Sequence, residues 1–97
     1  MFRIVKVQGQ SMEPYLSDGD FVLIYRRVKR LSVGDVVVCQ HPTYPRLIKK
    51  IIEINEQGDI LLTGCNPAGI STEEMGWVPA KLVEGKVIWE IRARNKH

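Results

Sequence analysis

Short apolar or alternating runs, separated by turn residues, constrain the fold of this chain more than any other feature of its sequence. Six runs have the length and residue types of β-strands: Phe2–Val7, Asp20–Tyr25, Asp35–Gln40, Leu47–Ile54, Asp59–Thr63 and Lys86–Ile91. Glycine or proline lies in the gaps between many of them, as at Gly19, Gly34 and Gly58, where the chain has to reverse. Helical periodicity is nearly absent. The pattern predicts an all-β, mainly antiparallel fold, built as a small, partly open β-barrel or sandwich.

The length and composition of the chain limit what it can contain. Its 97 residues are enough for one modest core and not for two, so we expect residues 1–97 to form a single domain. With 44% hydrophobic and 26% charged residues, the chain is globular rather than disordered. No stretch approaches the roughly 20 apolar residues that cross a bilayer, and Met1–Lys6 is too short and too charged for an anchor or an export signal. We therefore expect no transmembrane segment and a cytoplasmic location, while the oligomeric state stays open.

Two basic clusters, at residues 26–30 and 92–97, contribute to the net charge of +3. Such clusters either bind phosphates or remain solvated surface. They have no interleaved aromatic residues of the kind that stack on bases, so we expect no nucleic-acid partner. Cys39 and Cys65 lack the paired spacing of a zinc or redox site. We therefore predict that the protein uses no metal and no cofactor.

Ser11 and the adjacent lysines 49 and 50 are the residues with the clearest chemical potential. A serine hydroxyl is a poor nucleophile until a neighbouring group removes its proton, and lysine does so only as the neutral amine. An apolar setting such as residues 46–52 disfavours the ammonium ion and lowers the lysine pKa. Strict alternation puts Leu47, Lys49, Ile51 and Glu53 on one face of this strand and Ile48, Lys50, Ile52 and Ile54 on the other. Both faces are apolar, so alternation alone does not choose the lysine and leans slightly towards Lys50.

Several segments around these residues occur in the same order as the characteristic boxes of a protease family. They are Gly9–Leu16, Asp18–Val22, Gly34–Val38, Ile48–Lys50, Gly64–Pro67, Gly76–Pro79 and Leu82–Val87. The first resembles the Gly-x-Ser-Met-x-Pro-Thr-Leu box around the nucleophile of type I signal peptidases, and the fourth resembles the Ile-Lys-Arg segment that carries their lysine base. The resemblance implies that Ser11 is the nucleophile and Lys49 the base, because Lys50 then fills the basic position after the base. It also implies the β-fold of the signal peptidases and SOS-repressor proteases.

The resemblance extends to the groups around the dyad. The residues that it implies for binding the substrate and the oxyanion are Gly9, Gln10, Ser11 and Met12. The Ser11 backbone N–H is the first oxyanion donor, and Gly9 stands where some relatives have a hydroxyl. Ser71 is expected to orient the lysine amine, or else to be an ordinary turn residue. The last box departs from the family pattern at Cys65 and Pro67, where relatives carry an acid and an arginine.

Together these features predict a soluble serine endopeptidase with a Ser/Lys dyad, which removes a leader or propeptide from a precursor protein. The maturation proteases of nickel superoxide dismutase are the relatives most similar in layout, so that precursor is the candidate substrate. One alternative is a self-cleaving domain of the SOS-repressor type, although only ten residues precede Ser11, which disfavours cleavage in cis. The other is a catalytically silent β-domain that binds protein or nucleic acid.

Overall fold

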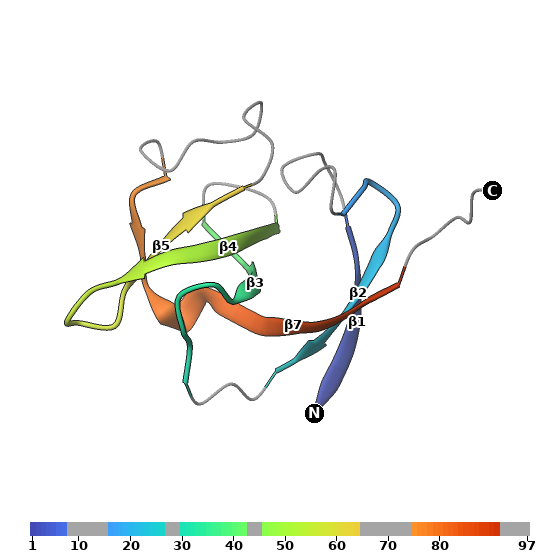
Figure 1. Ribbon diagram of the computed structural model, residues 1–97, viewed down its shortest axis with the longest axis horizontal. Helices are drawn as coiled ribbons and strands as arrows, with labels where there is room; N and C mark the ends of the chain where they lie inside the picture. Colours follow the sequence, from blue (N-terminus) through green and yellow to red (C-terminus); the bar gives the residue numbers. More distant parts are fainter. Residues whose placement is uncertain (8–15, 27–29, 43–45, 65–74, 92–97) are drawn as a thin grey trace.

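The structure of the chain is a computed structural model, which describes residues 1–7, 16–26, 30–42, 46–64 and 75–91. The elements are β1 (Phe2–Lys6), β2 (Phe21–Tyr25), β3 (Val36–Cys39), β4 (Leu47–Ile54), β5 (Ile60–Thr63), β6 (Trp77–Val78), the 3₁₀ helix η1 (Ala80–Leu82) and β7 (Val83–Ile91) (Figure 1). Within these ranges no helix is long and apolar enough to span a membrane.

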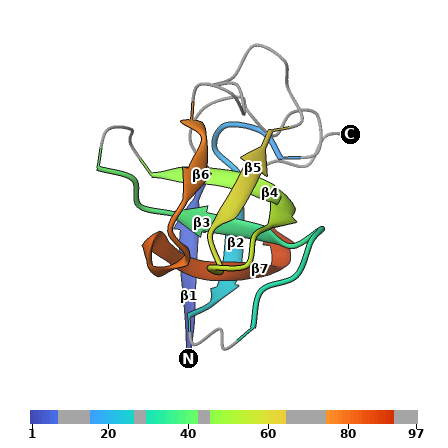
Figure 2. The ribbon, with the colours of Figure 1, turned by 90° about the vertical axis from the view of Figure 1, so that its left-hand side faces the viewer.

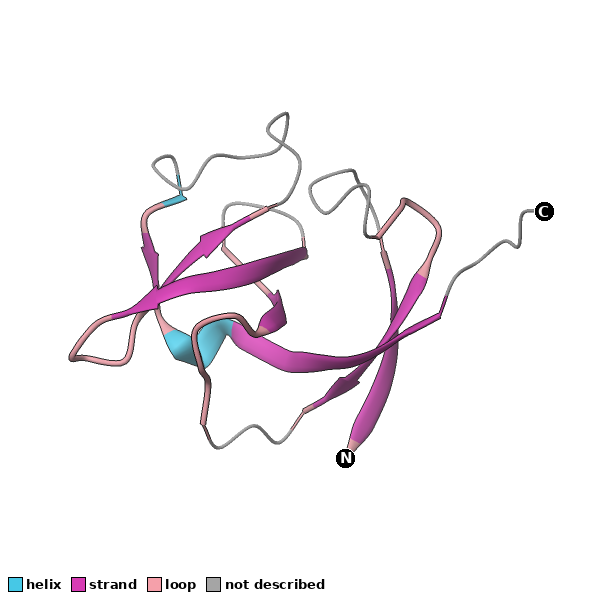
Figure 3. Cartoon of the chain, in the orientation of Figure 1, coloured by secondary structure: helices cyan, strands magenta, loops and turns pink. Residues whose placement is uncertain are grey.

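All seven described strands belong to one sheet, in the order β1-β2-β7-β3-β4-β5-β6. Every neighbouring pair is antiparallel. The last strand of the sequence, β7, therefore lies inside the sheet, and Figure 1 shows it running from the β3 and β4 side of the molecule to the β1 and β2 side. Strands dominate the described part of the chain (Figure 3). The prediction of an all-β, mainly antiparallel fold is confirmed.

The sheet is strongly bent. In Figure 2, β3, β4 and β7 run across the view, whereas β1 and β2 run nearly vertically. Bending of this kind lets one sheet fold over its own core, as in small barrels and orthogonal sandwiches. In the strand order of the described residues β1 and β6 are the two edges, so the barrel is partly open.

The observed strands differ from the predicted ones mainly near the end of the chain. The run predicted at Lys86–Ile91 begins earlier, at Val83, which pairs with Cys39 of β3. The sequence does not predict β6, because a strand of two residues is too short to show alternation. Trp77–Val78 is a strand only because it pairs with Leu61 and Ile60 of β5.

Two turns with the same Ser-x-Gly-Asp pattern precede β2 and β3. In each turn the aspartate N–H donates to the serine carbonyl, at 3.0 Å in Ser17–Asp20 and 3.1 Å in Ser32–Asp35. The aspartate carboxylate in turn accepts from the serine N–H, at 3.0 and 2.9 Å. The glycines, Gly19 and Gly34, have φ of +96° and +98°, the conformation that the third position of a type II turn requires. This local pattern therefore sets where each of the two strands begins.

Two clusters of buried side chains form the core, one on each face of β3 and β4. The first contains Val5, Val7, Leu16, Val22, Ile24, Val38 and Ile48. The second contains Val37, Cys39, Leu47, Ile51, Ile60, Leu62, Met75 and Val78. Successive residues of β3 alternate between the clusters, as side chains along a strand do. Burial on both faces explains why Val36–Cys39 is an uninterrupted apolar run.

Candidate active site

The two adjacent lysines of β4 lie in opposite environments. The Lys49 side chain is buried, with an exposed fraction of 1%, whereas Lys50 is exposed. Lys49 lies directly opposite Val37 of β3 in the antiparallel register, and residues paired in this way share a face of the sheet. Alternation puts it on the same face as Leu47 and Ile51, both members of the second core cluster. The neighbours of Lys49 along and across the ladder are therefore apolar.

A β-bulge in β4 decides which residues share the face of Lys49. Strict alternation predicts Glu53 on that face, but the register with β5 shifts just before Glu53, which leaves one extra residue in β4. Beyond the bulge Ile54 packs against the second core cluster, while Ile52 and Glu53 are both exposed. The prediction of unbroken alternation is therefore wrong. It favoured Lys50 only because Ile52 and Ile54 counted as apolar companions of that residue.

Backbone hydrogen bonds from the turn before β3 hold β4 next to the bulge. Gly34 N donates to the Ile51 carbonyl, and Ile51 N donates to the Asp35 carbonyl, both at 2.8 Å. The Asp35 carboxylate also pairs with the Lys86 ammonium of β7 at 3.3 Å. Because Ile51 is two residues from Lys49, the two backbone hydrogen bonds fix the part of β4 that carries the buried lysine, whereas the ion pair joins the turn to β7 and does not contact β4.

Burial alters the protonation of Lys49. An ammonium ion loses its hydration when it is buried, so desolvation lowers the pKa of Lys49 below its ordinary value of 10.5. Near neutral pH, a larger fraction of the molecules therefore has Lys49 as the neutral amine than would be the case for a lysine in water. Neutral lysine is the form that accepts a proton from a hydroxyl, so β4 presents a group suited to general-base chemistry.

The other predicted site residues lie outside the described residues. They are Gly9, Gln10, Ser11, Met12 and Ser71, together with the altered positions Cys65 and Pro67. The structure does describe both flanks of the segment that contains Ser11. Val7 and Leu16 are buried in the first core cluster, which also contains Ile48 of β4, and Val7 N donates to the Asp20 carbonyl at 2.7 Å. Both ends of the Ser11 segment are thus anchored in a cluster to which β4 contributes.

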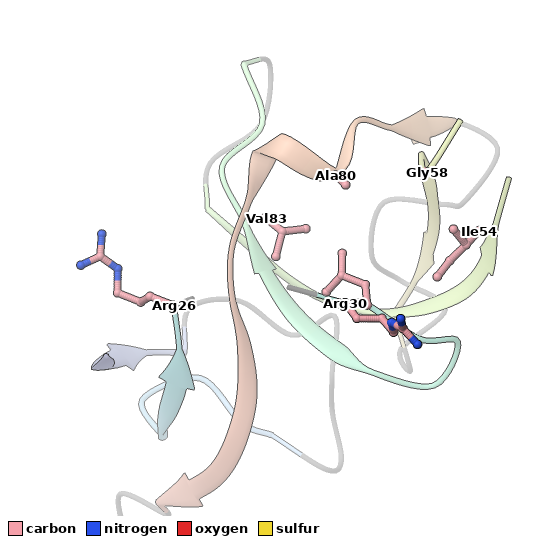
Figure 4. Close-up of a pocket in the computed structure, with 7 residues that line it drawn as sticks. Arg26, Arg30, Ile54, Gly58, Ala80 and Val83 are labelled. Carbon is pink, nitrogen blue, oxygen red and sulfur yellow. The ribbon is translucent and has the colours of Figure 1, made fainter. Parts of the chain in front are cut away.

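A pocket of about 340 Å³ lies beside η1. It is lined by Arg26, Arg30, Leu31, Ile54, Gly58, Ala80 and Val83. Figure 4 shows the Arg26 side chain well apart from that of Arg30, so the two guanidinium groups do not converge on a common anion. Among the described residues, those that line it include no serine, cysteine, histidine or lysine that could act as nucleophile or base. We therefore assign the candidate chemistry to Lys49 rather than to this pocket.

Comparison with protein families gives an independent result. The sequence matches the family model described as Peptidase S24-like over residues 2–88, which is most of the 97-residue chain. The chain belongs to the peptidase S24-like family. Membership supports a serine protease-type domain that acts on peptides, which agrees with the protease class predicted from the sequence. The family match identifies the peptidase family but does not reach the likeness to nickel superoxide dismutase maturation proteases, which concerns one subtype.

The matched region of this peptidase S24-like chain includes the positions of both Ser11 and Lys49. It also includes six of the described strands and β7 as far as Ile88. A search of curated proteins gave no significant match.

Proposed function

We propose that the chain is a serine endopeptidase in which Ser11 and Lys49 form a catalytic dyad. The observation that carries the proposal is the burial of Lys49, whose exposed fraction is 1%, within a domain of a peptidase family. Lysine is seldom buried so completely, because desolvating its ammonium group is costly. Ionisable groups with perturbed pKa values are concentrated at functional sites. A desolvated amine is what a serine nucleophile needs as its base.

The reaction follows from the chemistry of the pair. The neutral Lys49 amine takes the proton of the Ser11 hydroxyl as the oxygen attacks the peptide carbonyl. The resulting lysine ammonium then gives a proton to the leaving amine as the C–N bond breaks, which leaves an acyl group on Ser11. The neutral amine next removes a proton from water as the water oxygen attacks the ester carbonyl. The lysine ammonium then returns that proton to the Ser11 oxygen as the ester C–O bond breaks, which releases the acid and regenerates the free dyad. Lys49 alternates between base and acid, so its pKa has to lie nearer the working pH than that of a solvated lysine.

The remaining roles rest on the signal peptidase resemblance. The backbone N–H of Ser11 donates to the oxyanion that develops on the attacked carbonyl. Gly9, Gln10 and Met12 line the approach of the peptide, and the Ser71 hydroxyl orients the Lys49 amine. We further propose that the substrate is the leader or propeptide of a precursor protein in the cytoplasm, with the nickel superoxide dismutase precursor as the first candidate.

Acylation of Ser11 tests the dyad without knowledge of the natural substrate. The purified protein is mixed with excess activated peptide ester, the reaction is quenched with acid within the first turnover, before the acyl-enzyme is hydrolysed, and the acylated residue is located by mass spectrometry. We expect one acyl group, on Ser11, in the wild type and in Lys50→Met, and none in Ser11→Ala or Lys49→Met. Absence of acylation in the wild type would favour the catalytically silent β-domain. Acylation of Lys49→Met together with its loss in Lys50→Met would mean that Lys50, and not Lys49, is the base.

The substrate proposal needs a separate experiment. The protein is incubated with the nickel superoxide dismutase precursor and, in parallel, with an exported precursor that carries an ordinary signal peptide. Mass spectrometry then identifies the new N-termini, with Ser11→Ala as the control. Cleavage of only the exported precursor would reject the maturation-protease subtype, while the proposal of a Ser11/Lys49 dyad would still stand.

A further inference from the structure

The carboxylate of Glu84 joins three separate parts of the chain. Its side chain is only 7% exposed and lies near the start of β7. One oxygen, Oε2, accepts from Arg3 Nη1 of β1 at 3.2 Å. The other, Oε1, accepts from Gln40 Nε2 at 3.2 Å, just beyond the end of β3. Arg46, the residue before β4, contacts both oxygens, with Nε 3.1 Å from Oε1 and Nη2 3.4 Å from Oε2.

This arrangement is stronger than an ordinary surface ion pair. Isolated exposed pairs contribute little, whereas a fork-like arginine contact and a network of several charges contribute more. The Glu84 carboxylate is largely withdrawn from solvent and accepts four contacts, two on each oxygen. Because both oxygens are occupied, the carboxylate holds Arg3 and Arg46 at the same time.

The network joins the two hairpins that matter for the proposed reaction. The connection between β1 and β2 contains Ser11, and β4 of the β3–β4 hairpin carries Lys49. In the described sheet these hairpins do not pair with each other, because β7 lies between β2 and β3. The two ladders that pair β7 with its neighbours each contain a register shift, between Leu23 and Ile24 in the ladder with β2 and between Val38 and Cys39 in the ladder with β3. The Glu84 contacts therefore provide a side-chain link between two hairpins that the backbone ladders connect only through β7.

We propose that Glu84 is a positioning residue, which ties the hairpin that carries Ser11 to the hairpin that carries Lys49 through Arg3 and Arg46. Glu84 touches neither the substrate nor the reacting atoms in this scheme. It acts by holding the hydroxyl and the amine at a reacting distance, so the inference rests on the dyad of the proposed function. A displacement of about 1 Å between reacting groups lowers a rate by up to about a hundredfold.

The test cuts each arm of the network separately. Arg3→Met and Arg46→Met each remove one half-exposed arginine of the network. Lys86→Met is the matched control, because Lys86 is on the same strand as Glu84 and its ion pair, with Asp35, is not one of the Glu84 contacts. Kinetics with the activated peptide ester are measured at a pH where kcat no longer changes with pH, and well below the unfolding temperature of every variant. We expect either arginine variant to lower kcat by about tenfold to a hundredfold with KM nearly unchanged. Lys86→Met should keep the wild-type kcat.

The double variant distinguishes a tie from two independent stabilising contacts. If Glu84 links the two hairpins, losing either arginine breaks the link completely. The double variant Arg3→Met/Arg46→Met should therefore have a kcat no lower than that of the less active single variant. Two outcomes would overturn the proposal. One is a fold-loss of kcat in the double variant equal to the product of the two single-variant losses, and the other is a kcat in both arginine variants equal to that of Lys86→Met. Glu84→Gln should match the double variant if it folds, and the arginine variants decide the question if it does not.

A measurement independent of activity separates this inference from the proposed function. If the wild-type protein is not acylated at Ser11, the dyad proposal is rejected, whereas the proposal that Glu84 links the two hairpins is not affected. Hydrogen exchange then decides: Arg3→Met should speed amide exchange in Val36–Cys39 and Leu47–Ile54, although Arg3 is in β1. Exchange in those strands equal to that of Lys86→Met would refute the tie whether or not the protein is a protease.

Discussion

Val37 and Lys49 lie opposite each other in the β3–β4 ladder, and their side chains are 0% and 1% exposed. Directly opposed residues on one face of a sheet are near neighbours, so an apolar side chain flanks the lysine across the strand pair. Burial of the lysine, to which such neighbours contribute, is the physical cause of its lowered pKa. The pairing also makes the lysine sensitive to any charge introduced at position 37.

Stability should depend on pH through Lys49. The unfolded chain binds the Lys49 proton with the ordinary pKa of 10.5, whereas burial lowers the pKa in the folded state. Between the two values the unfolded state holds more protons, so the free energy of unfolding rises with pH across that window, by about 1.4 kcal/mol for each unit of lowering. Lys49→Met should remove this rise and be more stable than the wild type at neutral pH. Urea unfolding from pH 7 to 10.5 measures the difference, with Lys50→Met as the control for loss of an amine.

The rate of peptide hydrolysis should rise with pH. Only the neutral Lys49 amine accepts the serine proton, so kcat/KM increases as pH rises through the lowered pKa of this lysine, below 10.5. Lys49→Arg should lose about 10²- to 10⁴-fold in kcat/KM at the pH where the wild type is most active, because a guanidinium group stays protonated. Val37→Asp places a carboxylate opposite the amine and should move the rising limb to higher pH relative to Val37→Asn. Superimposable profiles for those two variants would mean that the base lies elsewhere.

The thiol of Cys39 should be inert in the folded protein. Its side chain is 1% exposed, and burial raises its pKa from 9.0 to about 12. The reactive thiolate is therefore suppressed at pH 8, and reagent access is blocked as well. In a Cys65→Ser background, a thiol reagent should modify Cys39 only as fast as the protein opens, and quickly in urea. Rapid modification of the native protein at pH 8 would contradict the buried position.

Gly34, in the turn before β3, and Gly85, in β7, should resist substitution for different reasons. Gly34 has φ of +98°, and nothing in the described part of the chain lies within 4 Å of the position that a Cβ would take there, so Gly34→Ala costs only backbone strain, about 1–2 kcal/mol. Gly34→Asn should cost less, because asparagine tolerates positive φ. At Gly85 a Cβ would lie 2.8 Å from Ile24 Cδ1 and 3.0 Å from the Tyr25 carbonyl, so Gly85→Ala should cost about 1–3 kcal/mol through overpacking. Urea unfolding of the three variants tests whether Gly34→Asn alone approaches the wild type.

Most strands could be predicted because their signals are local. The bounds Leu47–Ile54 are the same in the prediction and in the structure. The Ser-x-Gly-Asp turns mark the starts of β2 and β3 with hydrogen bonds between residues three apart. By contrast β6 could not be predicted, because Trp77–Val78 becomes a strand only through its partner β5.

The Glu84 network could not be read from the sequence either. Arg3 and Glu84 are 81 positions apart, and charged residues at these positions are indistinguishable from solvated surface in the sequence alone. They meet because the bent sheet brings β1, the β3–β4 connection and β7 together. A motif of neighbouring residues records none of this.

The sequence by itself determined the all-β class, the turn positions and two lysines in an apolar strand, since these depend on the conformational preferences of short segments. Which lysine is buried was decided only by the tertiary structure. The bulge after Ile51 and the pairing of Lys49 with Val37 depend on contacts between strands, and a shift by one residue in a strand moves every side chain to the other face. Burial, and with it the lowered pKa of Lys49, is therefore a property of the assembled sheet and not of the strand alone.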